Sequence, residues 1–458
     1  MAPAPLQTPT AEVVADPWRV MPAAAGPACA DHNASASPIP AEPLTLQRAV
    51  SMALCANPRT RSAWAAVAGQ AAVQGQARAS LFPVVNLTVS RTRDEQQTGL
   101  GGNNTVQANG GNLTLNWLLF DFGGRRAAIT QADQGLQAAL GSRDAALQDT
   151  VAEVAQAWYE VQAGAGAVAA AEVAAASARD ILKSAEARLA VGSVVPLDVM
   201  KARIALSQAQ LATARARGAE RIARGALARV MGVDLRVPLT LAFEPEASAA
   251  DVALAARSPA QDLQTLVGEA LAAHPALRAA RAQVRAAQAR LDGARAERLP
   301  SLSLSYGNYR NGRPNTALTN AQSREQLVAL TLSIPLFDGF GRSYRIHEQE
   351  ANLQARVADA AAAESRIAFE VWRAYQTVEA ETAAVSASSE LAQGAQEALA
   401  AARARHLAGA VDITEWLDAQ RQDANARQEH VAALAAWRHA RVRLLSSLGR
   451  SGFWEAKD

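Results

Sequence analysis

Residues 112–126, NLTLNWLLFDFGGRR, decide the fold. They alternate polar and apolar residues as far as Trp117, turn through Phe-Asp-Phe-Gly-Gly, and open a long segment without proline. Residues 326–342, QLVALTLSIPLFDGFGR, repeat this design. Phe120, Asp121, Gly124 and Arg125 stand 217 positions before Phe337, Asp338, Gly341 and Arg342. We therefore predict a β-strand that turns directly into a very long helix, twice in one chain.

The same offset persists along nearly the whole chain, which indicates an internal duplication. Matching landmarks are Asn57-Pro58 and His274-Pro275, Pro83 and Pro300, Gly192 and Gly409, and Gly232 and Gly449. The predicted organisation is an Ala/Pro-rich N-terminal segment (1–44), a first repeat (45–232), a linker (233–262), a second repeat (263–449) and a C-terminal tail (450–458).

Each repeat predicts the same series of elements. A short amphipathic helix (45–56 and 263–273) ends at the Asn-Pro or His-Pro, and a proline-free helix follows it. Two strands (84–93 with 112–119, and 301–309 with 328–334) flank a loop rich in Gly, Asn and Pro. A helix of 66 residues then follows (125–190 and 342–407), and a return helix ends at Gly232 or Gly449. At about 1.5 Å per residue the long helix reaches roughly 100 Å, which points to a coiled-coil-like assembly.

The strands separate apolar from polar residues. The predicted polar face comprises Asn86, Thr88, Ser90, Asn112, Thr114, Ser301, Ser303 and Ser305. A tilted strand of about 9–11 residues is long enough to cross a bilayer. A half-buried hairpin in a soluble sandwich has the same period, so one hairpin alone does not decide. Four strands cannot close a barrel in lipid, but three copies pool twelve, and the polar faces would then line water.

Composition excludes several classes of protein. Aromatic residues make up only 5% of 458 residues, and the net charge of +2 carries no localised basic block that would suit nucleic acid. We find no run of about 18 apolar residues, which argues against a transmembrane helix but leaves a transmembrane barrel open. Residues 1–44 show no apolar signal-peptide core. Cys29 and Cys55 either form a disulfide or remain two thiols.

The duplicated plan and two motifs carry a family resemblance. Leu-Phe-Asp-x-Gly-x-Arg marks the first strand-to-helix junction, the second is a close variant, and Arg-x-x-x-Gly-x-x-x-x-x-Asp/Glu marks both helix turns. Over about residues 45–449 the chain resembles the TolC-type outer membrane factors. The resemblance implies a mainly α fold with a membrane β-barrel portion: a trimer with a twelve-stranded barrel and an α-helical periplasmic tunnel. It also implies a homotrimer in the outer membrane of a Gram-negative bacterium, docked to an inner-membrane ABC transporter through a periplasmic adaptor.

The resemblance also assigns residues. It implies a periplasmic gate built from Asp198, Glu415 and Asp418, whose carboxylates would favour cations near the axis. Acidic residues in the first turn of a helix also suit its dipole, which is the plainer explanation. The adaptor would contact Val191, Gly192 and Ser193 and Ala408, Gly409 and Ala410, although glycine also simply ends helices. His406 and Val411 stand where the family example has Tyr and Arg, so its gate-locking network is in question.

No motif for catalysis, a cofactor or a metal is present: there is no nucleophile elbow, P-loop or H-E-x-x-H spacing. The early cysteines with ALCANP resemble a subset tied to type I secretion of RTX toxins such as adenylate cyclase-haemolysin. We therefore expect an exit duct for a protein toxin. Small-molecule efflux is the alternative, and a soluble coiled-coil scaffold is the alternative from a different class.

Overall fold

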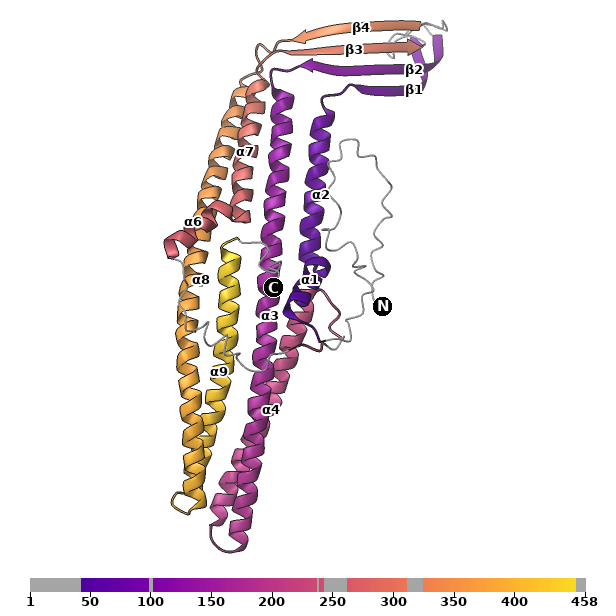
Figure 1. Ribbon diagram of the computed structural model, residues 1–458. Coiled ribbons are helices and arrows are strands. Elements are labelled where there is room, and N and C mark those ends of the chain that lie inside the picture. Colours follow the sequence, from indigo (N-terminus) through magenta and orange to yellow (C-terminus); the bar gives the residue numbers. More distant parts are fainter. Residues whose placement is uncertain (1–42, 99–101, 237–238, 243–261, 311–323, 450–458) are drawn as a thin grey trace. The chain divides into compact units, whose positions relative to one another are not determined.

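The computed structural model describes residues 43–98, 102–236, 239–242, 262–310 and 324–449. Its elements are, in order, α1 (Leu46–Ala56), α2 (Pro58–Ala79), β1 (Val84–Thr98), β2 (Gly102–Phe120), α3 (Gly124–Ala190), α4 (Pro196–Met231), α6 (Leu263–Ala273), α7 (Pro275–Ala296), β3 (Ser301–Arg310), β4 (Arg324–Ser333), α8 (Gly341–Leu407) and α9 (Ile413–Ser447) (Figure 1). The duplicated series of elements predicted from the sequence is therefore present in both repeats.

Two compact units divide the chain, and each draws on both repeats. The first holds the sheet, most of α2 and α7, and the first parts of α3 and α8 (the described residues within 66–140 and 279–361). The second holds α1, α4, α6, α9 and the remainder of α3 and α8 (the described residues within 43–65, 141–278 and 362–449).

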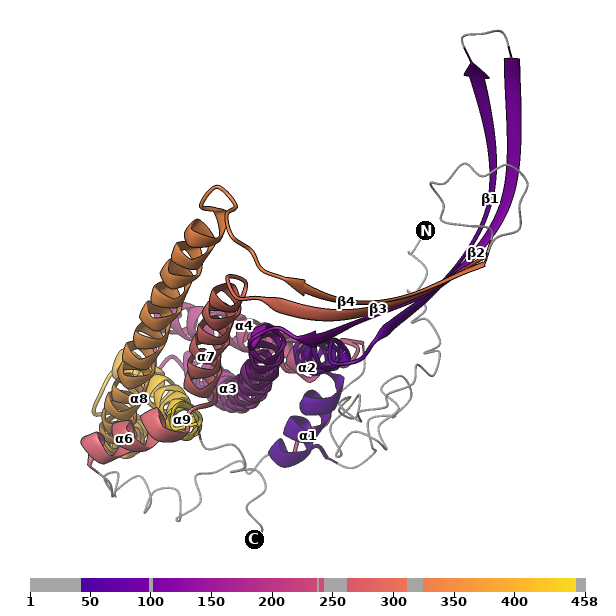
Figure 2. The same ribbon diagram turned by 90° about the horizontal axis from the view of Figure 1, so that it is seen from above.

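The sheet of the first unit is an antiparallel meander in the order β1-β2-β3-β4. Its register keeps the predicted faces apart. Leu115 lies between Val85 and Tyr306, and Trp117 pairs with Leu304, so apolar side chains share one face. Asn86 pairs with Thr114, and Ser303 with Thr331, on the other face. The β1–β2 hairpin continues well beyond the ends of β3 and β4 (Figure 2).

The length of that hairpin corrects one prediction. The stretch from Gly99 was predicted to be an exposed loop because it is rich in Gly and Asn. Instead residues 102–111 are part of β2, and Arg93 pairs with Gln107. Pairing of the backbone along β1 outweighs the weak strand propensity of Gly and Asn. The corresponding stretch 311–323 and residues 99–101 lie outside the described residues.

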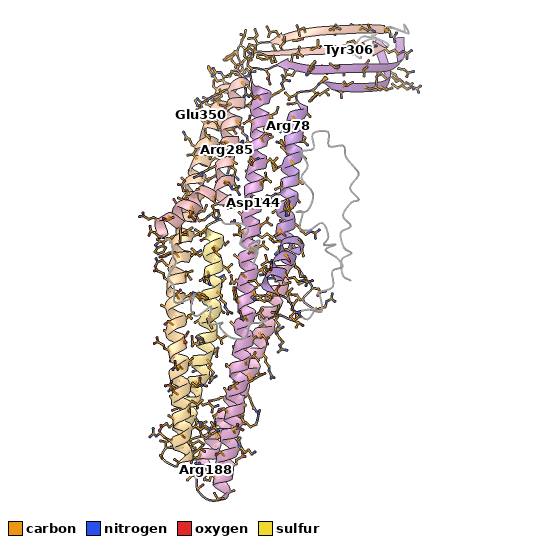
Figure 3. All side chains as sticks on the ribbon, viewed as in Figure 1. Arg78, Asp144, Arg188, Arg285, Tyr306 and Glu350 are labelled. Atoms are coloured by element: carbon orange, nitrogen blue, oxygen red, sulfur yellow. The ribbon has the colours of Figure 1, made fainter. Side chains whose placement is uncertain are left out.

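Small side chains allow the helices of the first unit to approach closely. Gln74 of α2 donates to Asp133 of α3 at 2.6 Å. Arg285 of α7 donates to Gln134 of α3 at 2.6 Å, and Arg295 of α7 pairs with Glu350 of α8 at 3.2 Å. Arg285 and Glu350 are labelled in Figure 3. Buried alanines fill the spaces between these polar contacts, as the alanine-rich composition predicts.

Each strand-to-helix junction is held by an aspartate. The Asp121 carboxylate accepts from the Arg125 amide at 2.6 Å, and Arg125 also donates to the Leu119 carbonyl at 2.9 Å. Asp338 accepts from the Arg342 amide at 3.0 Å and pairs with the Arg342 guanidinium at 3.2 Å. Of the eight junction residues predicted from the sequence, Asp121 with Arg125 and Asp338 with Arg342 therefore form two equivalent caps on the N-termini of the long helices.

Replacing Asp121 or Asp338 by alanine should lower the free energy of unfolding by about 1 kcal/mol each, because a helix N-terminus loses its side-chain acceptor. Chemical denaturation of the purified protein measures this. Asn retains the acceptor oxygen, so Asp121→Asn should cost clearly less than Asp121→Ala. An alanine variant as stable as the wild type would show that the carboxylate does not cap the helix.

In the second unit, α1 packs on the end of the first helical hairpin. Its core cluster includes Val50, Val154, Trp158, Leu227 and Met231, all buried. Asn57 links α1 to this hairpin by donating to the Val230 carbonyl at 2.7 Å, and it accepts from the Arg59 amide at the start of α2. A proline at the first position of α2 suits the helix start, which explains the Asn-Pro landmark.

The linker contributes to the same cluster. Leu239 and Leu241 are buried in it, and Leu241 bridges in parallel to Leu44. The described part of the linker, residues 233–236 and 239–242, therefore includes core positions, and Leu44, the last residue of the predicted N-terminal segment, is fully buried. Residues 243–261 lie outside the described part.

One helix also corrects the expectation about membrane spans. By length and composition, α3 contains a window apolar enough to cross a membrane, with a mean hydropathy of 1.2. The prediction rested on unbroken runs of strongly apolar residues, whereas alanine and valine raise the mean hydropathy in α3. Only 17% of that window is buried within the chain.

Candidate functional site

The α3–α4 and α8–α9 turns end their long helices in the same way. Gly192 and Gly409 have φ of 74° and 75°, in the left-handed region that favours glycine. The Ser193 amide donates to the Arg188 carbonyl at 2.9 Å, and the Ala410 amide to the Arg405 carbonyl at 2.9 Å. These are Schellman motifs, which satisfy the last carbonyls of a helix. The six turn residues predicted to contact an adaptor, 191–193 and 408–410, are all exposed.

Beside the turns, Arg188 joins the two helical hairpins. Its guanidinium lies 3.2 Å from Nε2 of His406 and also donates to the His406 carbonyl at 3.4 Å (Arg188 is labelled in Figure 3). Nδ1 of His406 lies 3.1 Å from the Val411 carbonyl oxygen, which can only accept. Because Arg188 can only donate, the ring is neutral and carries its proton on Nδ1. His406 is 6% exposed and packs on Trp416 at 5.2 Å between ring centroids.

A second link centres on Lys201 of α4. Its ammonium donates to the Thr414 hydroxyl at 3.2 Å and lies 3.8 Å from Asp412 and 3.9 Å from Asp198. Asp412 caps α9 by accepting from the Ile413 amide at 2.7 Å. The Thr414 hydroxyl, a donor to the Asp412 carboxylate, lowers the pKa of Asp412. Lys201 is the one cation among these four residues (Asp198, Lys201, Asp412 and Thr414). Asp198, predicted to belong to the gate, lies beside it.

The other two predicted gate carboxylates are paired within their own chain. Glu415 accepts from Arg405 at 2.9 Å, and Asp418 accepts from Arg421 at 2.7 Å. Both carboxylates are about half exposed, with side-chain exposures of 48% and 49%. Pairs this exposed hold their partners weakly, so these carboxylates are free to exchange partners.

Sequence patterns did not identify Lys201, Asp412 and Arg421. Two signals were present: Lys201 follows Asp198 by three residues, and Arg421 follows Asp418 by three, which places each pair on one helix face. The contact between Arg188 and His406 had no such signal, because the two residues lie 218 positions apart.

A comparison with protein families matches two segments of this chain, residues 49–233 and 266–450, to one family of outer membrane efflux proteins. The chain belongs to that family. The two matched segments coincide closely with the two sequence repeats, and the family places the protein in the outer membrane of a Gram-negative bacterium. The predicted TolC-like fold class is confirmed.

Relatives agree with this assignment. The chain is 36% identical over 412 residues to Protein CyaE of Bordetella pertussis, covering 89% of this chain and 85% of that protein. It is 25% identical over 419 residues to the cobalt-zinc-cadmium resistance protein CzcC of Cupriavidus metallidurans, covering 90% and 91%. One crystal structure of CusC, from work on its folding and transmembrane channel formation, superposes on this chain with a TM-score of 0.77 at 23% identity. The match covers 89% of this chain and 92% of that one.

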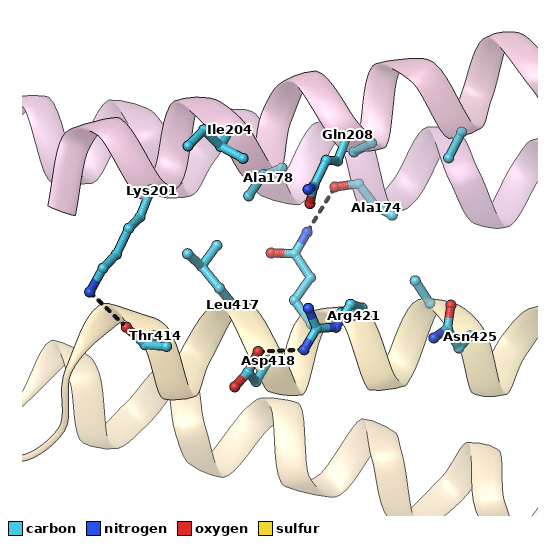
Figure 4. A pocket seen from close by; sticks show the side chains of 15 residues that line it. Ala174, Ala178, Lys201, Ile204, Gln208, Thr414, Leu417, Asp418, Arg421 and Asn425 are labelled. Carbon is cyan, nitrogen blue, oxygen red and sulfur yellow. Dashed lines mark hydrogen bonds and ion pairs between the residues drawn. The ribbon is translucent and has the colours of Figure 1, made fainter. Parts of the chain in front are cut away.

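In this outer membrane efflux protein the two hairpin ends also enclose a groove. It has a volume of about 480 Å³ and lies between α4 and the first part of α9, with Lys201 and Thr414 at one end (Figure 4). Gln420 crosses it and donates to the Ala174 carbonyl at 2.8 Å. Ile204, Leu417 and several alanines give it a largely apolar lining.

Two further expectations concern metals and cysteines. Within the described ranges, no group of three or more His, Cys, Asp or Glu side chains is placed to hold a metal ion. Cys55 lies in α1, whereas Cys29 lies outside the described residues, so both predicted alternatives, a disulfide or two thiols, stay predictions.

Proposed function

We propose that this outer membrane efflux protein works as a homotrimeric exit duct in a tripartite export system. The observation that supports it most is the four-stranded sheet. Its apolar side chains are exposed in the single chain: Leu87 is 70% exposed, Val89 78% and Val328 69%. Such a face suits lipid, and the opposite polar face suits a water-filled interior.

The edges of the sheet explain why several copies are needed. Within the described residues, β1 and β4 each pair on one side only. A free strand edge is not tolerated in lipid, so the edges must be paired by further strands. Three copies supply twelve strands, a number within the range of membrane barrels.

The helices carry a second feature that favours assembly. Leu197, Met200, Ile204, Leu211 and Ile222 of α4 are each more than half exposed. Their spacing of three, four, seven and eleven residues places them along one stripe of the helix. An apolar stripe of this length is typical of a helix that packs against another chain.

For the cargo, we favour a protein exported by type I secretion over small-molecule efflux. The cysteine-containing N-terminal region resembles the secretion subset, and CyaE is more similar to this chain than the metal resistance protein CzcC is, at 36% against 25% identity. We propose an ABC transporter and a periplasmic adaptor as partners, with the exposed turns at Gly192 and Gly409 contacting the adaptor. Energy would come from the transporter, and the duct itself would catalyse nothing.

Deleting the gene tests this proposal. Loss of one large secreted protein from the medium, with unchanged sensitivity to drugs and metal ions, supports protein secretion. Increased sensitivity with an unchanged set of secreted proteins supports efflux instead. A chain that fractionates as a soluble monomer would exclude both and favour the coiled-coil scaffold.

The gate proposal gives a prediction in planar bilayers. Replacing Glu415 by Gln and Asp418 by Asn should reduce the preference for cations severalfold, because a trimer would lose six carboxylates near its axis. The reversal potential in a salt gradient measures the preference. Replacing Glu429, an acidic residue farther along α9, by Gln is the control and should leave it unchanged. Equal cation selectivity in the double variant and the wild type would show that these carboxylates do not line the pore.

A further inference from the structure

A second cleft of the second unit is lined by charge. It has a volume of about 430 Å³ and is bounded by the start of α2, by α3, by the α6–α7 junction, by α8 and by the end of α9. Gln148, Ala152, His274 and Ile367 form a buried floor, and arginines stand at its rim. We call it the arginine cleft. None of the predicted gate, adaptor or junction residues lines it.

Positive charge exceeds negative charge around the cleft. Four arginines line it, namely Arg59, Arg366, Arg373 and Arg443, against three carboxylates, namely Asp149, Glu153 and Glu370. Arg59 binds two of those carboxylates, Asp149 at 2.9 Å and Glu153 at 2.7 Å. In the described part of the chain, the guanidinium groups of Arg366, Arg373 and Arg443 have no carboxylate within 4 Å. Three guanidinium groups therefore surround a space in which Glu370 is the one carboxylate outside the Arg59 pairs.

The floor of the cleft presents hydrogen-bond donors. Gln148 is 3% exposed, and its amide nitrogen has no partner among the described residues. A buried polar group without a partner costs free energy, so its presence needs an explanation. His274 is 9% exposed, and burial lowers its pKa, which keeps the ring neutral at pH 7. Its Nδ1 accepts from the Ala276 amide at 3.2 Å, so the ring proton is on Nε2, which can donate.

Divergence of the two repeats produced this chemistry. Arg366 stands 217 positions after Asp149, and Arg373 stands 217 after Gln156. His274 likewise takes the place of Asn57, whose side chain is used internally by the Val230 carbonyl. At the two arginine positions the second repeat thus supplies a cation where the first supplies an acidic or a neutral group, and all four of these residues line the same cleft.

We propose that the arginine cleft binds a small multivalent oxyanion of the pyrophosphate or polycarboxylate class. Guanidinium groups form paired hydrogen bonds with phosphate and carboxylate oxygens, and a partly desolvated site strengthens them. The amide nitrogen of Gln148 and Nε2 of His274 supply neutral donors below the charged rim. The volume is in the range of small-molecule sites. Glu370 repels any anion, so a multivalent ligand that contacts several guanidinium groups at once binds more favourably than a monovalent one.

Calorimetric titration of the full-length detergent-solubilised protein with inorganic pyrophosphate at low salt tests the site, and citrate provides a second arm. We expect saturable binding of one anion per chain, weakened by added salt. Arg366→Gln and Arg443→Gln should each weaken it about tenfold, since each removes a charge-assisted hydrogen bond. Arg403→Gln is the matched control: Arg403 is an exposed arginine of α8 outside the cleft, and its loss should leave the affinity unchanged.

Gln148→Leu tests the buried floor separately. It should weaken pyrophosphate binding severalfold while the melting temperature of the free protein stays equal or rises, because the unpartnered amide is gone. If neither anion bound the wild type saturably, the proposal would be overturned. That is the result expected if acidic side chains of a neighbouring chain fill the cleft. If Arg403→Gln weakened pyrophosphate binding as much as the cleft variants do, binding would depend on the overall charge of the protein. That result would also overturn the proposal.

Discussion

Replacing Gly232 by alanine should lower the free energy of unfolding by about 3 kcal/mol. Gly232 ends α4 with φ of 72°, a left-handed conformation that costs an alanine about 1–2 kcal/mol. A Cβ atom there would also lie 2.7 Å from the Ala56 carbonyl oxygen. That oxygen belongs to the backbone at the end of α1 and cannot move aside as a flexible side chain does, so overpacking adds about 1–3 kcal/mol.

Gly192 provides a matched control. It has nearly the same φ, 74°, and the same motif, but a Cβ atom there would meet nothing within 4 Å. Gly192→Ala should therefore cost only the conformational strain, about 1–2 kcal/mol. Guanidinium denaturation at one fixed protein concentration measures both variants. Equal losses at the two positions would show that the approach of α1 to Gly232 is not tight.

Gly449 repeats the prediction in the second repeat. Its φ is 72°, and a Cβ atom would lie 2.7 Å from the His274 Cα. Gly409 is its control, with φ of 75° and open space. Gly449→Ala should thus destabilise the protein about as much as Gly232→Ala, and Gly409→Ala about as little as Gly192→Ala.

Replacing Trp437 by alanine should cost about 3–5 kcal/mol, the range for large aromatic side chains in a core. Trp437 is 1% exposed and packs with Val385 and Leu434 between α8 and α9. Its indole nitrogen donates to the Thr382 hydroxyl at 3.2 Å, and Arg441 lies 4.7 Å over its ring. The apolar residues that pack with it, Val385, Leu434 and Ala433, are all smaller than the indole that would be removed.

Trp437→Phe separates packing from hydrogen bonding. Phenylalanine retains most of the buried apolar surface and loses the indole donor, so the expected loss is about 1–2 kcal/mol. Denaturation of both variants gives the comparison. If phenylalanine and alanine destabilised the protein equally, the hydrogen bond to Thr382 and not the packing would hold α8 against α9.

The alternation of polar and apolar residues and the internal duplication explain why so much of the fold was predictable. The alternation that begins at Asn112 is set by a face that needs apolar side chains and a face that needs polar ones, and it predicts the second half of β2 correctly. Phe120-Asp121 and Phe337-Asp338 were recognisable because capping a long helix requires the same residues in both copies. The longer extent of β2 was missed because Gly and Asn near residue 103 suggest a loop when backbone pairing is ignored.

Contacts between the hairpins were not predictable for a different reason. The position of Arg188 in its motif is visible in the sequence, but its partner His406 depends on how α3 and α8 pack. Arg188 and Arg405 are equivalent in the duplication, yet Arg405 binds Glu415 on its own hairpin. Asp198, the counterpart of Glu415, lies near Lys201 instead. A repeat predicts equivalent backbones, whereas each side chain takes the partner that tertiary packing provides.

Counting the chains in the assembled protein tests the proposed exit duct most directly. Among the described residues, the sheet has an unpaired strand edge on each side and an exposed apolar face. It predicts that the full-length protein, extracted from the outer membrane in mild detergent, has the mass of three chains by native mass spectrometry. Heating in strong detergent should reduce it to one chain. A monomer recovered from the soluble fraction, with its sheet edges open to water, would contradict the exit duct.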